Sequence, residues 1–183
     1  YNKKKLNNIK LFVDEVILHS QVVDIGSNLT SLEISNIMAR IDNDMSICRS
    51  MRQLCDKNII ILQIDVAEAL CNSNANQFNA INLMGAARSA IMTGIIHHLI
   101  IDYGLSVSIF YRNLATLFDS LLLEFPMPTD PMVKLLIRKK NESILWDWET
   151  QHLPLCEEYF NVENKIQISE TRFLVKLTNK NEK

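Results

Sequence analysis

Apolar residues recur at helical spacing from the start of this chain. Over residues 4–25 the recurring positions are Leu6, Ile9, Val13, Val16, Ile17 and Val23. This spacing predicts a first helix, which Gly26 would end. Residues 30–33, Thr-Ser-Leu-Glu, form a capping box, which predicts the start of a second helix that carries residues 34–41.

The next apolar stripe covers residues 44–71 and is interrupted once. Residues 59–62, Ile-Ile-Ile-Leu, are rich in β-branched side chains, which lower helix propensity. A buried helix is still favoured there, because residues 65–70 continue the stripe and no strand partner is evident nearby. Residues 72–76, Asn-Ser-Asn-Ala-Asn, predict a polar loop.

Residues 77–103 are apolar on nearly every side, which is typical of a helix buried in the middle of a domain. Gly104 would end this central helix. A further helix is predicted over residues 106–124, packed antiparallel to the central one across the turn at Gly104.

Two prolines exclude a helix over residues 125–129. Asp130 and Pro131 then predict a helix start, with Asp as N-cap and Pro at the first helical position. The basic run of residues 138–140 suits the last turn of that helix, where the dipole is negative. Two short helices are expected over residues 143–150 and 155–160.

The C-terminal part alternates between apolar and polar residues at 165–169 and partly at 172–177, which predicts one or two short strands or an extended arm. Residues 178–183 are expected to be disordered. The fold predicted from these patterns is all-α: six to eight helices in a multi-helix bundle or a short α-solenoid-like stack, with a minor β or extended element near the C-terminus. Residues 1–163 would form the helical domain and residues 164–183 the extended tail.

The composition agrees with one globular domain. The 183 residues are 48% hydrophobic and 22% charged, which excludes disorder for most of the chain. Glycine and proline number only 4 each, so tight turns are few and long helices are favoured. The formal net charge of -2 gives no overall attraction to nucleic acid or to an anionic membrane.

The cysteines and the apolar runs indicate a cellular setting. No two of the four cysteines form a Cys-x-x-Cys pair, and most lie in apolar helical patterns, so a reduced, intracellular location, cytoplasmic or nuclear, is expected. The longest apolar runs, such as residues 95–101, are too short to span about 30 Å of hydrocarbon. No membrane span is therefore expected.

Motifs that carry catalytic chemistry are missing from the sequence. It contains no Gly-x-Ser-x-Gly, no Walker loop and no glycine-rich dinucleotide turn. The sequence does not contain Glu-x-x-His twice, as a di-metal helical bundle requires, and no second cysteine pair completes a zinc site. His98 and Asp102, like Glu15 and His19, are four residues apart, which is interpreted as ordinary pairing on a helix surface. No catalytic residue, metal or cofactor is expected, and the chain is predicted not to be an enzyme.

The positive hints concern protein partners. Trp146 and Trp148 lie two residues apart, and tryptophan is enriched at binding hot spots. The alternating tail, with Phe173 and Val175, could add a strand to the sheet of a partner. The main hypothesis is a non-enzymatic protein–protein interaction module, a subunit or scaffold of a larger assembly, with these four residues as its partner-binding site. Oligomeric state stays open.

Three alternatives remain open. A nucleic-acid-associated helical protein would use the short basic patch Arg138, Lys139 and Lys140. Residues 85–103 resemble, at the level of fold only, the central hydrophobic helix of Bcl-2-type modulators, although the Asn-Trp-Gly-Arg signature of that family is absent.

The third alternative is an enzyme or small-ligand binder with a pocket near His97, His98 and Met92. In such a pocket a carboxylate could orient a neighbouring histidine as a general base. Histidine suits this role because small changes of environment move the imidazole pKa across neutral pH.

Overall fold

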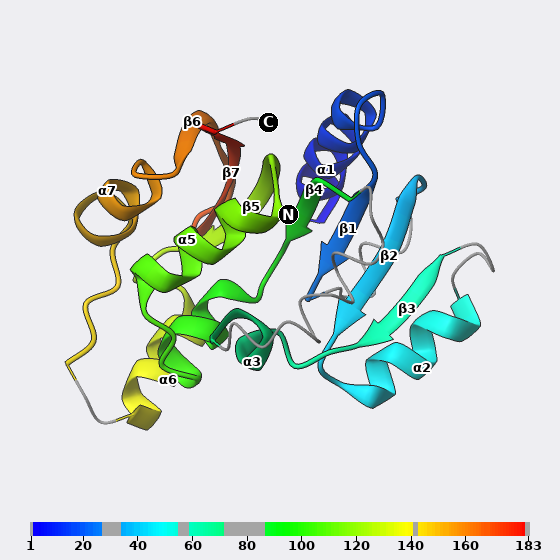
Figure 1. The fold of residues 1–183 in the computed structure, drawn as a ribbon. Helices are drawn as coiled ribbons and strands as arrows, with labels where there is room; N and C mark the ends of the chain where they lie inside the picture. Colours follow the sequence, from blue (N-terminus) through cyan, green and yellow to red (C-terminus); the bar gives the residue numbers. More distant parts are fainter. Residues whose placement is uncertain (1, 27–33, 55–58, 72–86, 141–142, 182–183) are drawn as a thin grey trace.

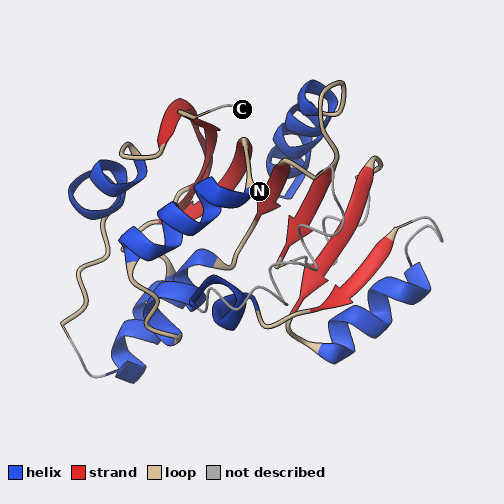
Figure 2. Cartoon of the chain, in the orientation of Figure 1, coloured by secondary structure: helices blue, strands red, loops and turns tan. Residues whose placement is uncertain are grey.

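A single mixed sheet organises the molecule, which we describe from a computed structural model for residues 2–26, 34–54, 59–71, 87–140 and 143–181 (Figures 1 and 2). Its strands are β1 (Val22–Ile25), β2 (Ile37–Asp42), β3 (Ile60–Gln63), β4 (Ser89–Met92), β5 (Ser120–Pro126), β6 (Phe160–Ser169) and β7 (Arg172–Asn179). Their order is β3-β2-β1-β4-β5-β7-β6. The first five run parallel, whereas β7 is antiparallel to both β5 and β6.

Helices cover both faces of this sheet. They are α1 (Asn2–Val16), α2 (Met45–Leu54), α3 (Val66–Cys71), α5 (Val107–Leu117), α6 (Pro131–Lys140) and α7 (Leu153–Cys156), with short π-helical turns η2 (His98–Asp102) and η3 (Trp148–His152). On one face, α1 packs Ile9, Phe12 and Val13 into the smaller of two apolar cores. Residues of α3, α5, α6 and α7 form the larger core on the other face.

Successive residues of the central strands enter opposite cores. In β5, Leu121 and Leu123 belong to the larger core, whereas Leu122 between them belongs to the smaller one. Side chains alternate across a strand, so a strand covered on both faces is mainly apolar on both sides. The central strands are therefore short, mainly apolar runs, without the alternation that marks a half-exposed strand. The charged residues within them, Asp24 of β1, Arg40 of β2 and Glu124 of β5, are buried in ion pairs.

This architecture corrects the prediction of an all-α bundle or solenoid-like stack. The chain is a mixed α/β protein with a seven-stranded sheet. The apolar runs contain Ile, Leu, Met and Ala, which suit a buried helix as well as a buried strand, and periodicity alone does not separate the two. Pairing with neighbouring strands, which are distant in sequence, decides between them.

Three predicted helices in the first half of the chain are corrected in this way, two of them in part, because α1, α2 and α3 are helical where helices were expected. The helix expected over residues 4–25 ends at Val16, and the strand β1 follows, so Gly26 ends a strand and not a helix. Residues 37–42 form the strand β2 in place of a second helix, and residues 60–63 form β3. The capping box at residues 30–33 and the loop at residues 72–76 lie outside the described residues.

The predicted central pair of helices is also corrected. Of residues 77–103, the described part begins at residue 87 and contains the strand β4 and the π-helical turn η2. The helix expected over residues 106–124 stops at Leu117, because the N–H groups of Asp119 and Ser120 bond to the carbonyl oxygen of Arg88 and start β5 beside β4.

Local signals near the C-terminus predicted their elements well. The helix expected to begin at Asp130 and Pro131 is confirmed as α6, with Asp130 Oδ1 accepting from the Met132 N–H at 2.9 Å. Strands are present where the alternating segments predicted them, and β7 continues through Thr178 and Asn179, which were expected to be disordered. The predicted division between residues 163 and 164 falls inside β6.

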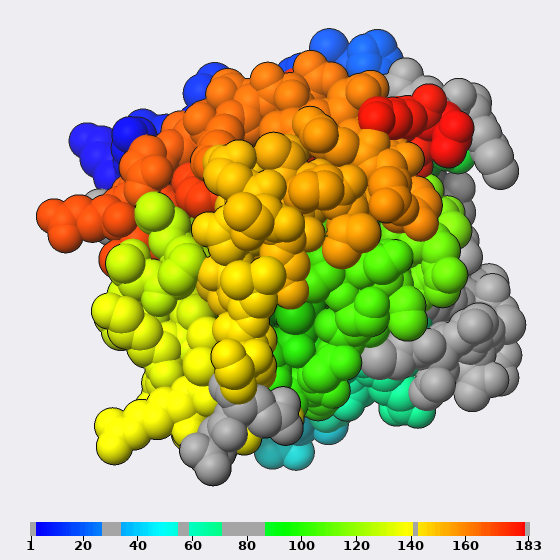
Figure 3. Space-filling view, turned by 90° about the vertical axis from the view of Figure 1, so that its left-hand side faces the viewer, coloured from blue at the N-terminus to red at the C-terminus, as the bar shows by residue number. Residues whose placement is uncertain are grey.

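The predicted short helices after α6 are shorter than expected and shifted. Residues 143–147 have no regular secondary structure, and the helical turns η3 and α7 occupy residues 148–156. Figure 3 shows residues 143–160 as a strip in yellow and orange that runs over one side of the molecule between α6 and α5. In the part of the chain that is described, no helix is long and apolar enough to cross a membrane.

Candidate functional site

A cavity lies at the carboxyl ends of the parallel strands. Its volume is about 740 Å³, within the range of about 300–1,000 Å³ that small-molecule sites occupy. Gly26 follows β1, Asp42 ends β2, Asp65 follows β3 and Thr93 follows β4, and all four line the cavity. The chain order of the strands reverses at β1, which has β2 on one side and β4 on the other. Open α/β sheets bind ligands at such a switch point.

Gly26 allows the end of β1 to approach the segment after β4. Its φ of 68° is in the left-handed region, which favours glycine. A Cβ at this position would lie 2.8 Å from the Cβ of Ile95, closer than side chains tolerate. The two loops that flank the switch point are thereby held side by side, and Gly94 and Ile95 also line the cavity.

Carboxylates line the cavity near β2 and β3. Asp42 is partly buried, and its Oδ1 accepts from the N–H of Asp44 at 2.8 Å. Burial raises the pKa of the Asp42 carboxyl above its usual value. Asp44 accepts from the hydroxyl of Ser46 at 2.6 Å, and this bond lowers the pKa of Asp44. A carboxylate at the end of β2 can accept hydrogen bonds from the hydroxyl groups of a ribose.

The segment after β4 supplies neutral polar groups. Thr93 is 1% exposed and His97 is 2% exposed. Among the described residues, neither Thr93 Oγ1 nor His97 Nδ1 has a hydrogen-bond partner. Burial lowers the pKa of His97 to about 4, so the imidazole is neutral at neutral pH. The ring of His98 lies against it, with centroids 4.4 Å apart.

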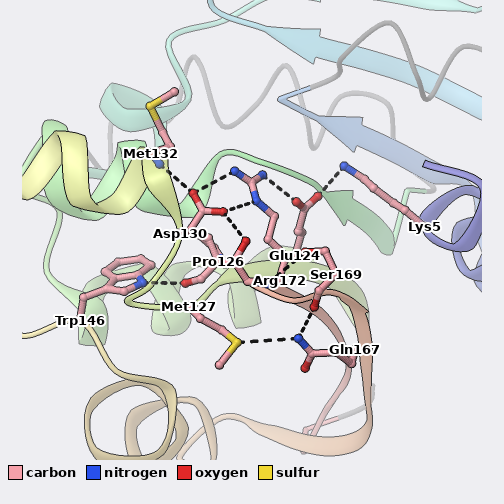
Figure 4. Close-up of polar contacts among 11 residues, drawn as sticks. Lys5, Glu124, Pro126, Met127, Asp130, Met132, Trp146, Gln167, Ser169 and Arg172 are labelled. Carbon is pink, nitrogen blue, oxygen red and sulfur yellow. Dashed lines mark hydrogen bonds and ion pairs between the residues drawn. The ribbon is translucent and has the colours of Figure 1, made fainter. Parts of the chain in front are cut away.

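Arg172 brings a buried ion-pair network to the cavity wall (Figure 4). From β7 its Nη1 donates to Glu124 Oε1 at 2.9 Å, and its Nε donates to Asp130 Oδ2 at 2.7 Å. Lys5 of α1 pairs with the other oxygen of Glu124 at 2.5 Å. Burial alone would raise the pKa of Asp130, but hydrogen bonds from Arg172, Met132 and Thr171 outweigh it and the pKa is lowered.

The network joins α1, β5, β7 and the start of α6 around the carboxyl end of β5. Each of its two carboxylates meets a cation, so it brings no large net charge to the cavity. Its effect on the site is to fix the position of Arg172.

The residues predicted to bind a partner lie in the core. Trp146, Trp148 and Phe173 are 3–4% exposed, and Val175 is fully buried. The rings belong to an aromatic cluster, formed by Tyr111, Phe125, Trp146, Trp148, His152 and Phe173. Trp146 Nε1 donates to the carbonyl oxygen of Pro126 at 2.7 Å, as Figure 4 shows.

The predicted basic patch is placed on the surface. Arg138, Lys139 and Lys140 are exposed in the last turn of α6. None of the three lines the cavity.

The pocket suggested near the adjacent histidines is partly reflected in the structure. His97 and His98 both line the cavity, whereas Met92 is buried in the larger core and does not line it. The His98–Asp102 spacing belongs to η2, and both residues also face the cavity. Among the described residues, no group of three His, Cys, Asp or Glu side chains could hold a metal ion.

Four lining residues were not predicted from the sequence as site residues: Asp42, Asp65, Thr93 and Arg172. The available signal is an aspartate that directly follows an apolar, β-branched run, as in Ile41-Asp42 and Ile64-Asp65. That signal is informative only once the runs are known to be parallel strands, whose carboxyl ends meet at one edge. Arg172 stands in an antiparallel strand far along the chain, and nothing local links it to the others.

Comparison with known proteins identifies the fold. No family model matches the sequence, and no curated protein matches it closely enough to count as a relative. Among solved structures, a putative methyltransferase from Thermobifida fusca YX is 16% identical with a TM-score of 0.61, over 98% of this chain and 80% of that one. Magnesium protoporphyrin IX methyltransferase (ChlM) from Synechocystis PCC 6803, with bound SAH, is 13% identical with a TM-score of 0.54, over 93% and 83%.

A third similar structure is WbdD in complex with the kinase inhibitor LY294002, which is 15% identical with a TM-score of 0.61. It matches 96% of this chain, which spans only 40% of the WbdD chain. At these identities the likeness shows the fold: the chain resembles Rossmann-like methyltransferases.

The predicted function is corrected by this finding. The sequence predicted a non-enzymatic interaction module or scaffold, because it indicated an all-α fold without catalytic motifs. Two of the alternatives, a nucleic-acid-associated helical protein and a Bcl-2-like modulator, assumed the same helical fold. The fold is instead that of proteins described as methyltransferases, among them structures with bound SAH. The helical premise that these inferences shared is therefore wrong. The similar structures also contradict the prediction that the chain is not an enzyme, because methyltransferases share its fold.

Proposed function

We propose that this protein is an S-adenosylmethionine-dependent methyltransferase. The observation that carries the proposal is the cavity at the β1/β4 switch point of a sheet ordered β3-β2-β1-β4-β5-β7-β6. Similar structures with the same fold hold SAH, S-adenosylhomocysteine, which is the product of methyl donation. The proposal replaces the expectation that no cofactor is bound.

The lining of the cavity fits this cofactor. S-adenosylmethionine supplies an electrophilic methyl group on a positively charged sulfonium sulfur. Among the described residues, four carboxylates line the cavity, Asp42, Asp44, Asp65 and Asp102, against one cationic side chain, Arg172. Such an excess of negative charge in a low-dielectric cleft attracts a cationic ligand.

Asp42 is the residue we assign to the ribose. It ends β2 beside the switch point, where an acidic side chain in related dinucleotide folds accepts from ribose hydroxyls. Its Oδ1 is oriented by the N–H of Asp44, which fixes the carboxylate toward the cavity that both residues line.

Isothermal titration of the full chain with SAH tests the proposal. The wild type should bind SAH saturably. Asp42→Asn should weaken the affinity about 10- to 100-fold, because a hydrogen bond to a charged group contributes about 1.5–3 kcal/mol. Asp14→Asn is the matched control, since Asp14 is exposed on α1 and away from the cavity, and should bind as the wild type does. A folded wild type that does not bind SAH would refute the proposal.

Two expectations from the sequence stay predictions beside this function. They are a protein partner and a cytoplasmic or nuclear location. The proposed methyltransferase function is compatible with both expectations and depends on neither of them.

A further inference from the structure

We propose that Thr93 and His97 hold the methyl acceptor, and that this acceptor is an uncharged, largely apolar molecule that presents a hydroxyl group. The inference rests on the proposed function and names the substrate class of the same cavity. Both residues follow β4, the strand beside the switch point, and both line the cavity.

Two polar side chains beside the cavity indicate a bound acceptor. Thr93 Oγ1 and His97 Nδ1 are buried, and neither has a hydrogen-bond partner among the residues that the structure describes. Buried polar groups in folded proteins are nearly always hydrogen-bonded, so each exception calls for an explanation. Two exceptions four residues apart, beside one cavity, indicate that a bound molecule supplies their partners.

The charged side chains of the cavity restrict the charge of the acceptor. Arg172 is its cationic side chain, and two carboxylates, those of Glu124 and Asp130, already engage it. The other charged lining residues in the described part of the chain are acidic. A phosphate group or a polyanion such as nucleic acid would therefore be repelled. Because the cationic cofactor already occupies the acidic cavity, an acceptor without charge of its own is favoured.

Part of the cavity wall is apolar. Ile95, Leu99 and Met132 line the same cavity as Thr93 and His97. Apolar walls with a few convergent polar groups are typical of sites that bury the body of a small molecule and orient one functional group. The hydroxyl would be that group.

The chemistry distinguishes a hydroxyl acceptor from an amine. The acceptor oxygen forms the new O–CH3 bond with a lone pair, while the C–S bond breaks and its electron pair stays on sulfur as a neutral thioether. The hydroxyl proton passes to the unprotonated ring nitrogen of His97 and later to solvent, so charge balances. A hydroxyl becomes strongly acidic as the methyl bond forms, so even a weakly basic imidazole can take its proton; a neutral amine needs no such base.

Ring signals of His97 in the full chain, measured by NMR with saturating SAH, test the acceptor site. Phenol and phenyl phosphate are matched probes, because they differ by one phosphate group. Phenol should shift the His97 signals saturably, and phenyl phosphate should not. Thr93→Val should weaken phenol binding several-fold, since one hydrogen bond is lost. An SAH complex in which phenol leaves His97 unchanged, or in which phenyl phosphate binds better, would overturn the inference.

Transfer of a labelled methyl group from S-adenosylmethionine to phenol tests the role of His97. His97→Gln should lower kcat at least 100-fold and leave the affinity for SAH unchanged. His19→Gln is the matched control, because His19 is exposed and does not line the cavity. Wild-type kcat in His97→Gln, or no transfer to phenol by the wild type, would overturn proton acceptance by His97. Failure of the proposed function is distinct, because SAH itself would then not bind.

Discussion

Two buried histidines mark two regions that resemble each other in burial and differ in surroundings. His97 is 2% exposed and His152 is fully buried. Burial lowers the pKa of His97 to about 4 and that of His152 to about 3, so both rings are neutral at neutral pH. Each also has one buried nitrogen without a hydrogen-bond partner among the described residues.

The two histidines differ in the groups that surround them. His152 Nδ1 lies 3.2 Å from the hydroxyl of Tyr111, and aromatic rings enclose the rest of the imidazole, with Phe125 at 4.7 Å and Trp146 at 4.8 Å between centroids. His97 instead lines a cavity with Thr93. A buried, neutral histidine therefore indicates a site only where it lines an open volume, as His97 does. In the aromatic cluster it indicates a core.

The largest expected effect comes from breaking the aromatic cluster. Trp146 stacks on Phe125 with the rings 7° from parallel, and it donates to Pro126. Trp146→Ala should lower the free energy of unfolding by about 3–5 kcal/mol, measured by urea denaturation, while folded protein keeps its affinity for SAH. Leu145→Ala, at a side chain 60% exposed, should cost less than about 0.5 kcal/mol. Equal costs in the two variants would contradict the assignment of Trp146 to the core.

The second effect concerns pH and separates the two histidines. Below about pH 6.5 the unfolded chain binds a proton at His97, and the folded chain does so only near pH 4. The free energy of unfolding is therefore unaffected by His97 above about pH 6.5. It falls as the pH decreases from about 6.5 to about 4, because only the unfolded chain binds the proton in this range. His97→Gln should reduce that loss by about 3 kcal/mol, at about 1.4 kcal/mol for each pKa unit.

Urea denaturation at pH 7, 5.5 and 4 measures this difference. The groups that face His97 are His98, Arg172, Asp130 and Glu124, which remain in the variant. His152 also remains, so the variant should still lose stability in acid, with a smaller slope. An equal loss in both proteins would show that His97 is protonated, or exposed, in the folded state.

The smallest effect is at Thr93. Thr93→Val removes a hydroxyl without a partner among the described residues and should raise the free energy of unfolding by up to about 1 kcal/mol. The matched change in the other region is Thr150→Val, where the hydroxyl donates to Asp147 at 2.8 Å, and it should lower stability slightly. The measurement is the direction in which the unfolding temperature changes in each variant. A lower unfolding temperature in Thr93→Val would show that the Thr93 hydroxyl has a hydrogen-bond partner in the folded protein.

Much of the local structure near the C-terminus could be predicted from the sequence. Asp130 and Pro131 begin α6 as expected, because an N-cap and a proline act through neighbouring backbone atoms. The alternation around Ile166 and Ile168 predicted β6, since this edge strand has an exposed side and keeps the period of two. The central strands gave no such period, because both of their faces are buried.

The candidate site could not be predicted in the same way. Asp42, Thr93 and Arg172 are separated by 51 and then 79 residues of chain, and no local pattern brings them together. They meet because β2, β4 and β7 lie in one sheet and the parallel strands end at one edge. The sequence suggested a pocket near His97 and His98, but only the packing of the chain decides that His97 is buried and His98 partly exposed.

The sequence by itself determined the N-cap that begins α6 and the C-terminal strands, and it showed no apolar run long enough to span a membrane, in agreement with the described part of the chain. These depend on composition or on neighbours within a few residues. The tertiary structure decided that Val22–Ile25, Ser89–Met92 and the other short apolar runs are strands, and it placed the cavity at their ends. The physical reason is that a parallel strand obtains all its backbone partners from distant segments and buries both faces, so nothing in its own residues records the pairing.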